Sequence, residues 1–182
     1  YEPEFDQMLF YLPLTGSTFK KVYYDELLGR AVSKFIQAED LIVPYTASSL
    51  EDADAIVHVI KISENDLRKQ QVGGFYRDIE LGDPPINENQ VKAKQLELEG
   101  VTANDQQRES MYTLLEVHTD LDLEDYPDVN ENEEPTGIKL PYIITIDETS
   151  QQVLSIRRNY EPEDPLKKKK NYFVQFKFLP GT

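Results

Sequence analysis

Three polar side chains at alternate positions of one predicted strand, His118, Asp120 and Asp122, have residue types that bind metal ions. They lie in Met111–Leu123, where polar and apolar residues alternate. Alternate side chains of a strand share a face and are roughly 7 Å apart. Imidazole and carboxylate groups on one face can bind a catalytic metal ion, as they do in metal-dependent hydrolases. The other interpretation of this pattern is a solvated strand face.

The acidic segment 128–134 is a second candidate cation site. Its Asp-x-Asn-x-Asn spacing is that of the start of a calcium-binding loop. Such a loop needs glycine at its sixth position and a bidentate glutamate at its twelfth, whereas this chain has Glu133 and Lys139 there. We therefore predict an acidic hairpin loop, and whether it binds a cation stays open. In the hydrolase hypothesis, one of its carboxylates joins the His118 group.

A block of four lysines, Lys167, Lys168, Lys169 and Lys170, is the one run of basic residues in the chain. The acids and prolines of the preceding segment 161–165 predict an exposed loop. In one interpretation these lysines are solvated charges that protect the following apolar strand from aggregation. In the other they contact DNA phosphates or an acidic partner protein.

The other histidine, His58, lies in the predicted strand Ala55–Ile62 and shares a face with Ile56 and Ile60. The sequence places no Asp, Glu or second His near it at a useful spacing, so we predict a hydrogen-bonded core histidine. The chain has no cysteine and two histidines, and it contains neither a phosphate-binding loop nor an ordered Ser/His/Asp set. We predict no catalytic residue, no metal, no cofactor and no enzymatic activity.

The N-terminal half is predicted to be built around a β-hairpin, 18–24 and 30–37, whose connection ends at Gly29. A short helix over 2–12 precedes the hairpin, and a short strand over 41–43 follows it. After the buried strand 55–62, residues 63–66 are a predicted helix start with Ser63 as its cap, and the helix continues over 67–76.

The rest of the chain is predicted to hold a helix over 87–99 and then strands of alternating pattern. The strands span 112–123, 140–146, 153–158 and 171–179, and we predict that they form one antiparallel sheet. The predicted class is α+β, with two antiparallel β modules joined by a helical or mobile middle segment. The predicted domains are 1–82, a connector over 83–110, and 111–182.

Composition sets further limits. The chain has 182 residues and a formal net charge of −15. An acidic chain lacks the basic footprint with which proteins usually bind nucleic acid. No stretch approaches the roughly 18 apolar residues that a membrane-spanning helix needs, so we predict no membrane contact.

Several segments, taken in order, resemble portal proteins of short-tailed, double-stranded DNA bacteriophages. The segments are LPLTGSTFKKVYYD, AEDLIVPYTASSLEDADAIVHVIKISENDLRKQQVGGFYRDI, EPTGIKLPYIITID and VLSIRRNY. The resemblance covers most of the chain and is weakest over Pro84–Ser110. Because such portals are longer at both ends, the chain is interpreted as an internal fragment.

The resemblance implies a structural subunit of a twelve-fold ring at one capsid vertex, located in the virion and assembled in the host cytoplasm. Its implied partners are further copies of itself, a terminase motor, the capsid protein, tail or head-completion proteins, and duplex DNA that passes through the channel without sequence specificity. Acidic residues on the channel wall would repel DNA phosphates and let the duplex slide. The alternatives are the metal-dependent hydrolase and an acidic protein-interaction domain.

Overall fold

The structure is a computed structural model that describes residues 3–25, 29–82, 111–129 and 132–178. It contains helices and two antiparallel sheets, which confirms the predicted α+β class. The helix predicted over 87–99 and the connector over 83–110 lie outside the described residues.

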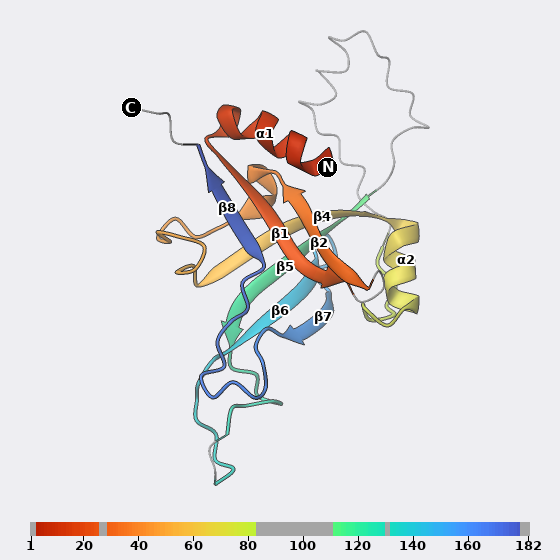
Figure 1. Ribbon diagram of the computed structural model, residues 1–182. Coiled ribbons are helices and arrows are strands. Elements are labelled where there is room, and N and C mark those ends of the chain that lie inside the picture. The colour runs from red at the N-terminus through yellow and green to blue at the C-terminus, as the bar shows by residue number, and fades with distance from the viewer. Residues whose placement is uncertain (1–2, 26–28, 83–110, 130–131, 179–182) are drawn as a thin grey trace. The chain divides into compact units, whose positions relative to one another are not determined.

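Most predicted elements are present with small changes at their ends (Figure 1). Helix α1 continues three residues beyond its predicted end, to Thr15, and α2 ends at Val72, because Gly73 and Gly74 follow it and Gly74 has a φ of +73°. The elements in chain order are α1 (Pro3–Thr15), β1 (Ser17–Asp25), β2 (Arg30–Ile36), the 3-10 helix η1 (Ala38–Asp40), β3 (Leu41–Ile42), β4 (Ala55–Ser63), α2 (Glu64–Val72), β5 (Met111–Leu121), β6 (Leu140–Asp147), β7 (Val153–Arg158) and β8 (Phe173–Lys177).

The strands form a three-stranded sheet in the order β2-β1-β8 and a five-stranded sheet in the order β3-β4-β5-β6-β7. The prediction that the last strand joins the sheet of the other C-terminal strands is wrong. Strand β8 pairs antiparallel with β1, with Lys20 opposite Val174. A period-two pattern predicts a strand but does not specify its partner, and the long segment between β7 and β8 lets the chain cross to the other sheet.

The structure divides into two compact units, and both take residues from each half of the chain. The first comprises 1–58, 117–143 and 157–182, and the second comprises 59–116 and 144–156. The units therefore do not follow the predicted boundaries at 82 and 111. The five-stranded sheet itself combines β3 and β4 from the first half of the sequence with β5, β6 and β7 from the second half.

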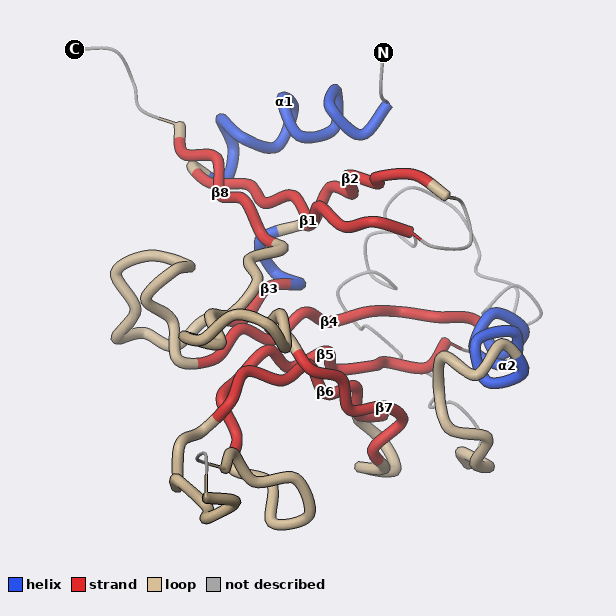
Figure 2. Tube along the Cα trace, turned by 60° about the horizontal axis from the view of Figure 1, so that its bottom comes forward, coloured by secondary structure: helices blue, strands red, loops and turns tan. Residues whose placement is uncertain are grey.

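The first unit buries its main core between the β2-β1-β8 sheet and the chain around β3. This core consists of Phe19, Ile36, Leu41, Ala53, Ile56 and Phe173. Helix α1 lies over the opposite face of the small sheet, on the side away from β3 (Figure 2). The Tyr11 ring stacks on Phe35 at 5.7 Å between centroids, and Glu4 Oε2 accepts a 3.1 Å bond from the Phe35 backbone N–H.

Strand β8 contributes Phe173 to this core, with 8% of its surface exposed. The sequence pattern instead predicts an inward face made by Tyr172, Val174, Phe176 and Phe178. That prediction is wrong, because Val174 is 45% exposed and Phe178 is 46% exposed. Both faces of this strand carry aromatic residues, so alternation alone does not identify the buried one. Ile156 in β7, also predicted to point inward, is 50% exposed.

The second unit packs α2 against its own parts of the large sheet. Its core comprises Leu67, Tyr76, Tyr112, Leu114 and Leu154. Ser63 caps the helix as predicted, since its Oγ accepts a 3.2 Å bond from the Asp66 backbone N–H.

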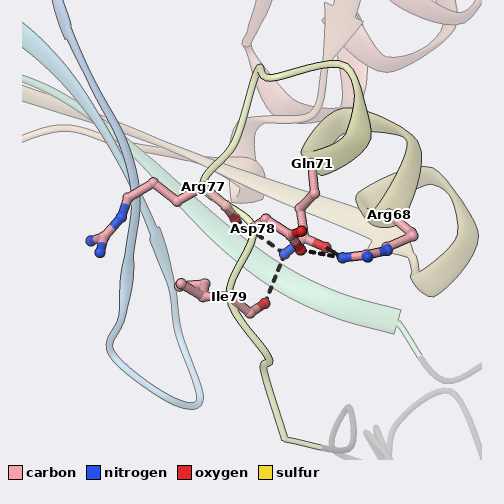
Figure 3. A network of polar contacts seen from close by, with 5 residues as sticks. All are labelled: Arg68, Gln71, Arg77, Asp78 and Ile79. Atoms are coloured by element: carbon pink, nitrogen blue, oxygen red, sulfur yellow. Dashed lines mark hydrogen bonds and ion pairs between the residues drawn. The ribbon is translucent and has the colours of Figure 1, made fainter.

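A polar network joins α2 to the chain that follows it (Figure 3). The buried Gln71 amide donates to the carbonyls of Arg77 and Ile79, at 3.2 and 2.8 Å. Its oxygen accepts from Arg68, which also pairs with Asp78. In the same segment the Arg77 backbone N–H donates to Leu154 O at 2.8 Å, which connects this chain to β7.

Candidate functional site

The strand face that carries His118 is buried rather than solvated. Tyr112, Leu114 and His118 all lie below 9% exposure, and the His118 ring contacts the rings of Tyr172 and Phe173 at centroid distances of 5.8 and 4.9 Å. The predicted solvated face is therefore wrong for this part of β5. Tyr172 and Phe173 cover His118, and the sequence pattern of β5 alone could not reveal that.

The three predicted metal ligands do not form a cluster. Asp120 and Asp122 are exposed, whereas His118 is buried. In the described part of the chain, no three His, Cys, Asp or Glu side chains are arranged to hold one metal ion. The second histidine, His58, is half-buried and also contacts Phe173, at 5.9 Å between centroids.

The first of the four lysines is attached to the acidic loop. Lys167 Nζ pairs with Asp128 Oδ1, and Asp128 Oδ2 accepts a 2.7 Å bond from the Thr136 hydroxyl. These hydrogen bonds, the one from Lys167 first, hold the pKa of Asp128 below its ordinary value. The first acid of the calcium-like motif is thus engaged with a lysine.

Two further lysines also bind groups of the protein itself. Lys169 Nζ donates to the Ala53 carbonyl at 2.9 Å. Lys170 Nζ pairs with Glu161 at 2.5 Å, and this hydrogen bond raises the pKa of Lys170. Lys168 is exposed. Of the four side chains predicted to contact DNA or a partner, Lys167 and Lys169 therefore attach their loop to other segments of the first unit, and Lys170 pairs within the loop.

The conformation of this lysine loop, residues 161–171, is set by Asp164. Its carboxylate accepts bonds from the backbone N–H groups of Leu166 and Lys168, at 3.0 and 3.1 Å, and these bonds lower its pKa. The loop returns to the body at Asn159, whose carbonyl accepts from the Lys170 N–H at 2.9 Å. The side-chain nitrogen of Asn159 donates to Lys170 O at 3.2 Å.

Beside this loop lies a pocket of about 60 Å³ in the first unit, which we call the Asn159 pocket. Its wall includes His118 and Asp120 of β5, Asn159, Lys169 and Lys170, and the segment that precedes β4, with Glu51 and Asp54. Sequence reasoning identified His118, Asp120 and the lysines but not Asn159. A lone asparagine after a strand carries no sequence signal that predicts its burial.

A different surface is formed by the side of α1 that faces away from the small sheet. Leu9, Phe10 and Leu14 are 48%, 68% and 70% exposed there, and we call these three residues the α1 outer face. Every residue from Met8 to Leu14 is apolar, so the helix is apolar all round along this stretch. Such helices are usually covered by protein, and exposed apolar groups of this kind mark interaction surfaces.

No protein-family model matches the chain, and a search of curated proteins returns no significant match. In the described part of the chain, neither helix has the length and hydrophobicity that crossing a bilayer demands.

Proposed function

We propose that the chain is part of a portal subunit of a short-tailed, double-stranded DNA bacteriophage. In this proposal it has a structural role, without chemistry of its own, in a ring at a capsid vertex. DNA would pass through that ring during packaging and ejection. The observation that carries the proposal is the ordered resemblance of the four sequence segments.

The resembling segments form the framework of both sheets. The first contains β1, the second runs from η1 through α2, and the last two contain β6 and β7. These elements supply strands to both sheets, whereas the segment of weakest resemblance, Pro84–Ser110, falls wholly on residues that are not described. The resemblance therefore concerns scaffold elements, as expected for a subunit whose role is mechanical.

Surface chemistry also supports a role in assembly. A chain with a net charge of −15 has little tendency to bind duplex DNA tightly, which suits a channel through which DNA slides. The α1 outer face is an apolar surface that a neighbouring subunit or head protein could cover.

Electron microscopy of the full-length gene product tests the proposal. Rings with a central hole wide enough for duplex DNA are the expected result. A monodisperse monomer or dimer at micromolar concentration, in the absence of other phage proteins, would contradict it. In that case the acidic interaction domain becomes the better interpretation.

A further inference from the structure

Strand β8 forms one edge of the small sheet, and no described residue pairs with its outer side (Figure 1). The Val22 N–H donates to Tyr172 O at 2.7 Å. At the other end of the strand, the Phe178 N–H donates to Gly16 O at 3.0 Å. Because hydrogen bonds to one neighbour alternate along an antiparallel strand, even-numbered residues of β8 bond to β1 and odd-numbered residues direct their N–H and C=O groups outward. The outward residues are Phe173, Gln175 and Lys177.

The other sheet edges in the described part of the chain are protected, each by a different device. At β2, Glu4 Oε2 of α1 accepts the outward N–H of Phe35 at 3.1 Å. At β7, Leu154 O accepts the Arg77 N–H at 2.8 Å. Strand β3 has two residues, and so short an edge offers little template for another strand. Among the described strands, β8 therefore has the most open backbone edge.

The side chains of β8 can pack against a further strand. Val174 lies opposite Lys20, whose Nζ is 5.4 Å from the ring centroid of Phe5 in α1, so Val174 is on the face of the sheet that α1 covers. On that face Val174 is 45% exposed and Phe178 is 46% exposed. Apolar side chains of an added strand would cover both, and such cross-strand pairs stabilise sheets. On the other face, Lys177 is exposed and its ammonium group makes no hydrogen bond or ion pair with a described residue.

The small sheet is locally basic, although the whole chain is acidic. Its three strands contain one acid, Asp25, and several cations. The cations are Lys20, Lys21, Arg30, Lys34 and Lys177. Pairing with a second copy would bring two basic sheets together, in chains that each have a net charge of −15, and like charges repel in both cases. An acidic strand from another protein has the complementary charge.

We propose that the outer edge of β8 binds an extended segment of a partner protein in which apolar residues alternate with acidic or polar ones. The segment adds a strand antiparallel to β8 and bonds to the backbone of Phe173, Gln175 and Lys177. Its apolar side chains lie beside Val174 on the α1 face, and an acid lies opposite Lys177. In this mode of recognition, main-chain hydrogen bonds supply affinity and alternate side chains supply specificity. The inference does not depend on the proposed portal function.

The test uses the synthetic peptide acetyl-Glu-Val-Thr-Val-Thr-Val-amide, whose glutamate meets Lys177 in the antiparallel register. Hydrogen exchange and ¹H–¹⁵N NMR spectra of the 182-residue chain are recorded with and without it. Without peptide, the outward amides of Phe173, Gln175 and Lys177 should exchange faster than those of Val174 and Phe176, which bond to β1. The peptide should shift the resonances of β8 saturably and slow exchange at the three outward amides.

Two pairs of variants separate the backbone contribution from the charge contribution. Gln175→Pro removes one outward N–H, at an edge position where proline is tolerated, and should weaken peptide binding by about tenfold. Gln175→Ala is its control, because both variants lose the 2.9 Å bond from Gln175 Nε2 to Ser17 Oγ and the alanine variant keeps the N–H. Lys177→Gln should weaken binding by up to about fivefold. Lys34→Gln, on the opposite edge strand, should retain the wild-type affinity.

Several results would overturn the proposal. Linear shifts, or saturable shifts confined to residues outside β8 and its neighbours, would show that the peptide does not bind this edge. Equal affinity for a peptide with lysine in place of glutamate, or equal weakening by Lys177→Gln and Lys34→Gln, would exclude recognition of an acidic strand. Slow exchange at the outward amides without peptide would show that the edge is already covered. Protection that grows with protein concentration would assign the cover to a second copy, and constant protection would assign it to the chain itself.

Discussion

At the scale of single residues, Phe173 joins several parts of the first unit. Its ring belongs to the core with Phe19 and Ile36 of the small sheet, and both histidines of the chain contact it, His118 at 4.9 Å and His58 at 5.9 Å. The ring thereby connects the small sheet to β4 and β5 within this unit. Its contribution should exceed that of the other aromatic residues of the last strand.

Replacement of Phe173 by alanine should therefore lower the free energy of unfolding by about 3–5 kcal/mol, the usual cost of truncating a buried phenylalanine. Phe178→Ala is the matched control, because Phe178 is 46% exposed, and it should cost much less. Denaturant unfolding measures both. Equal losses in the two variants would mean that the buried face of β8 has been assigned wrongly.

The Asp128 carboxylate should contribute to acid sensitivity. Hydrogen bonds from Lys167 and Thr136 hold its pKa below the ordinary value of 3.8. A group with a lowered folded-state pKa contributes stability that is present above its unfolded pKa and is lost as pH falls through the folded pKa. Asp128→Asn should therefore destabilise the protein near pH 7 and flatten the fall in stability below about pH 4.

Thermal unfolding of both proteins between pH 7 and pH 2.5 checks this. Asp125→Asn, an exposed acid in the same region, serves as the control and should follow the wild type. A wild-type slope retained in Asp128→Asn would show that Lys167 does not stabilise the ionised form.

At the scale of elements, α2 depends on one buried side chain. Gln71 supplies both donors for the Arg77 and Ile79 carbonyls. Gln71→Ala removes them, and the cost should be about 1–3 kcal/mol, as for buried groups left without partners. The neighbouring Gln70→Ala, which removes none of these bonds, should change stability by less than about 0.5 kcal/mol. Hydrogen exchange at residues 75–81 should speed up in Gln71→Ala alone, and unchanged protection there would contradict the role of the network.

The lysine loop gives a second prediction at this scale. Lys167, Lys169 and Lys170 bind Asp128, the Ala53 carbonyl and Glu161, so the triple glutamine variant should unfold at a lower denaturant concentration than the wild type. Lys168→Gln should leave stability within about 0.5 kcal/mol, since this side chain is exposed.

Because the other three lysines bind groups of the protein itself, any contact of this loop with phosphate or with a partner protein depends mainly on Lys168. Under the proposed function, Lys168→Gln in the full-length portal subunit should weaken binding to DNA or terminase and reduce its salt dependence, because fewer counterions are released. Unchanged affinity and unchanged salt slope for both partners would leave the lysines with a structural role alone.

The sequence predicted the positions of the helices and strands better than it predicted which strands pair with one another. Ser63 and the Gly73-Gly74 pair act locally, so the cap and the end region of α2 could be read from neighbouring residues. The pairing of β8 with β1 joins residues about 160 positions apart, such as Thr18 and Phe176, and alternation carries no information on such a distance. The burial of His118 and Asn159 depends on the same crossing, because the segment that leads to β8 packs beside them.

At the scale of the whole molecule, the net charge opposes association between copies of the chain, whereas exposed apolar surface favours it. The net charge of −15 makes copies of the chain repel one another at low salt, and the α1 outer face favours association. Specific, stable interfaces bury roughly 800 Å² on each partner. The α1 outer face supplies three large side chains, Leu9, Phe10 and Leu14. Because even an aromatic side chain buries only about 150–250 Å², the area of these three falls short of roughly 800 Å² and is too little to hold a ring together.

We therefore expect residues 1–182 alone to remain monomeric, even though the full-length protein forms a ring under the proposed function. Static light scattering at 10 and 100 µM, in low and in physiological salt, measures the mass, and a value near 21.1 kDa is expected throughout. Weak association that grows with salt and disappears in Phe10→Ser/Leu14→Ser would assign the residual attraction to the α1 outer face. A stable dodecamer formed by these residues would contradict the prediction, because it would require an interface larger than the exposed apolar surface of α1 can provide.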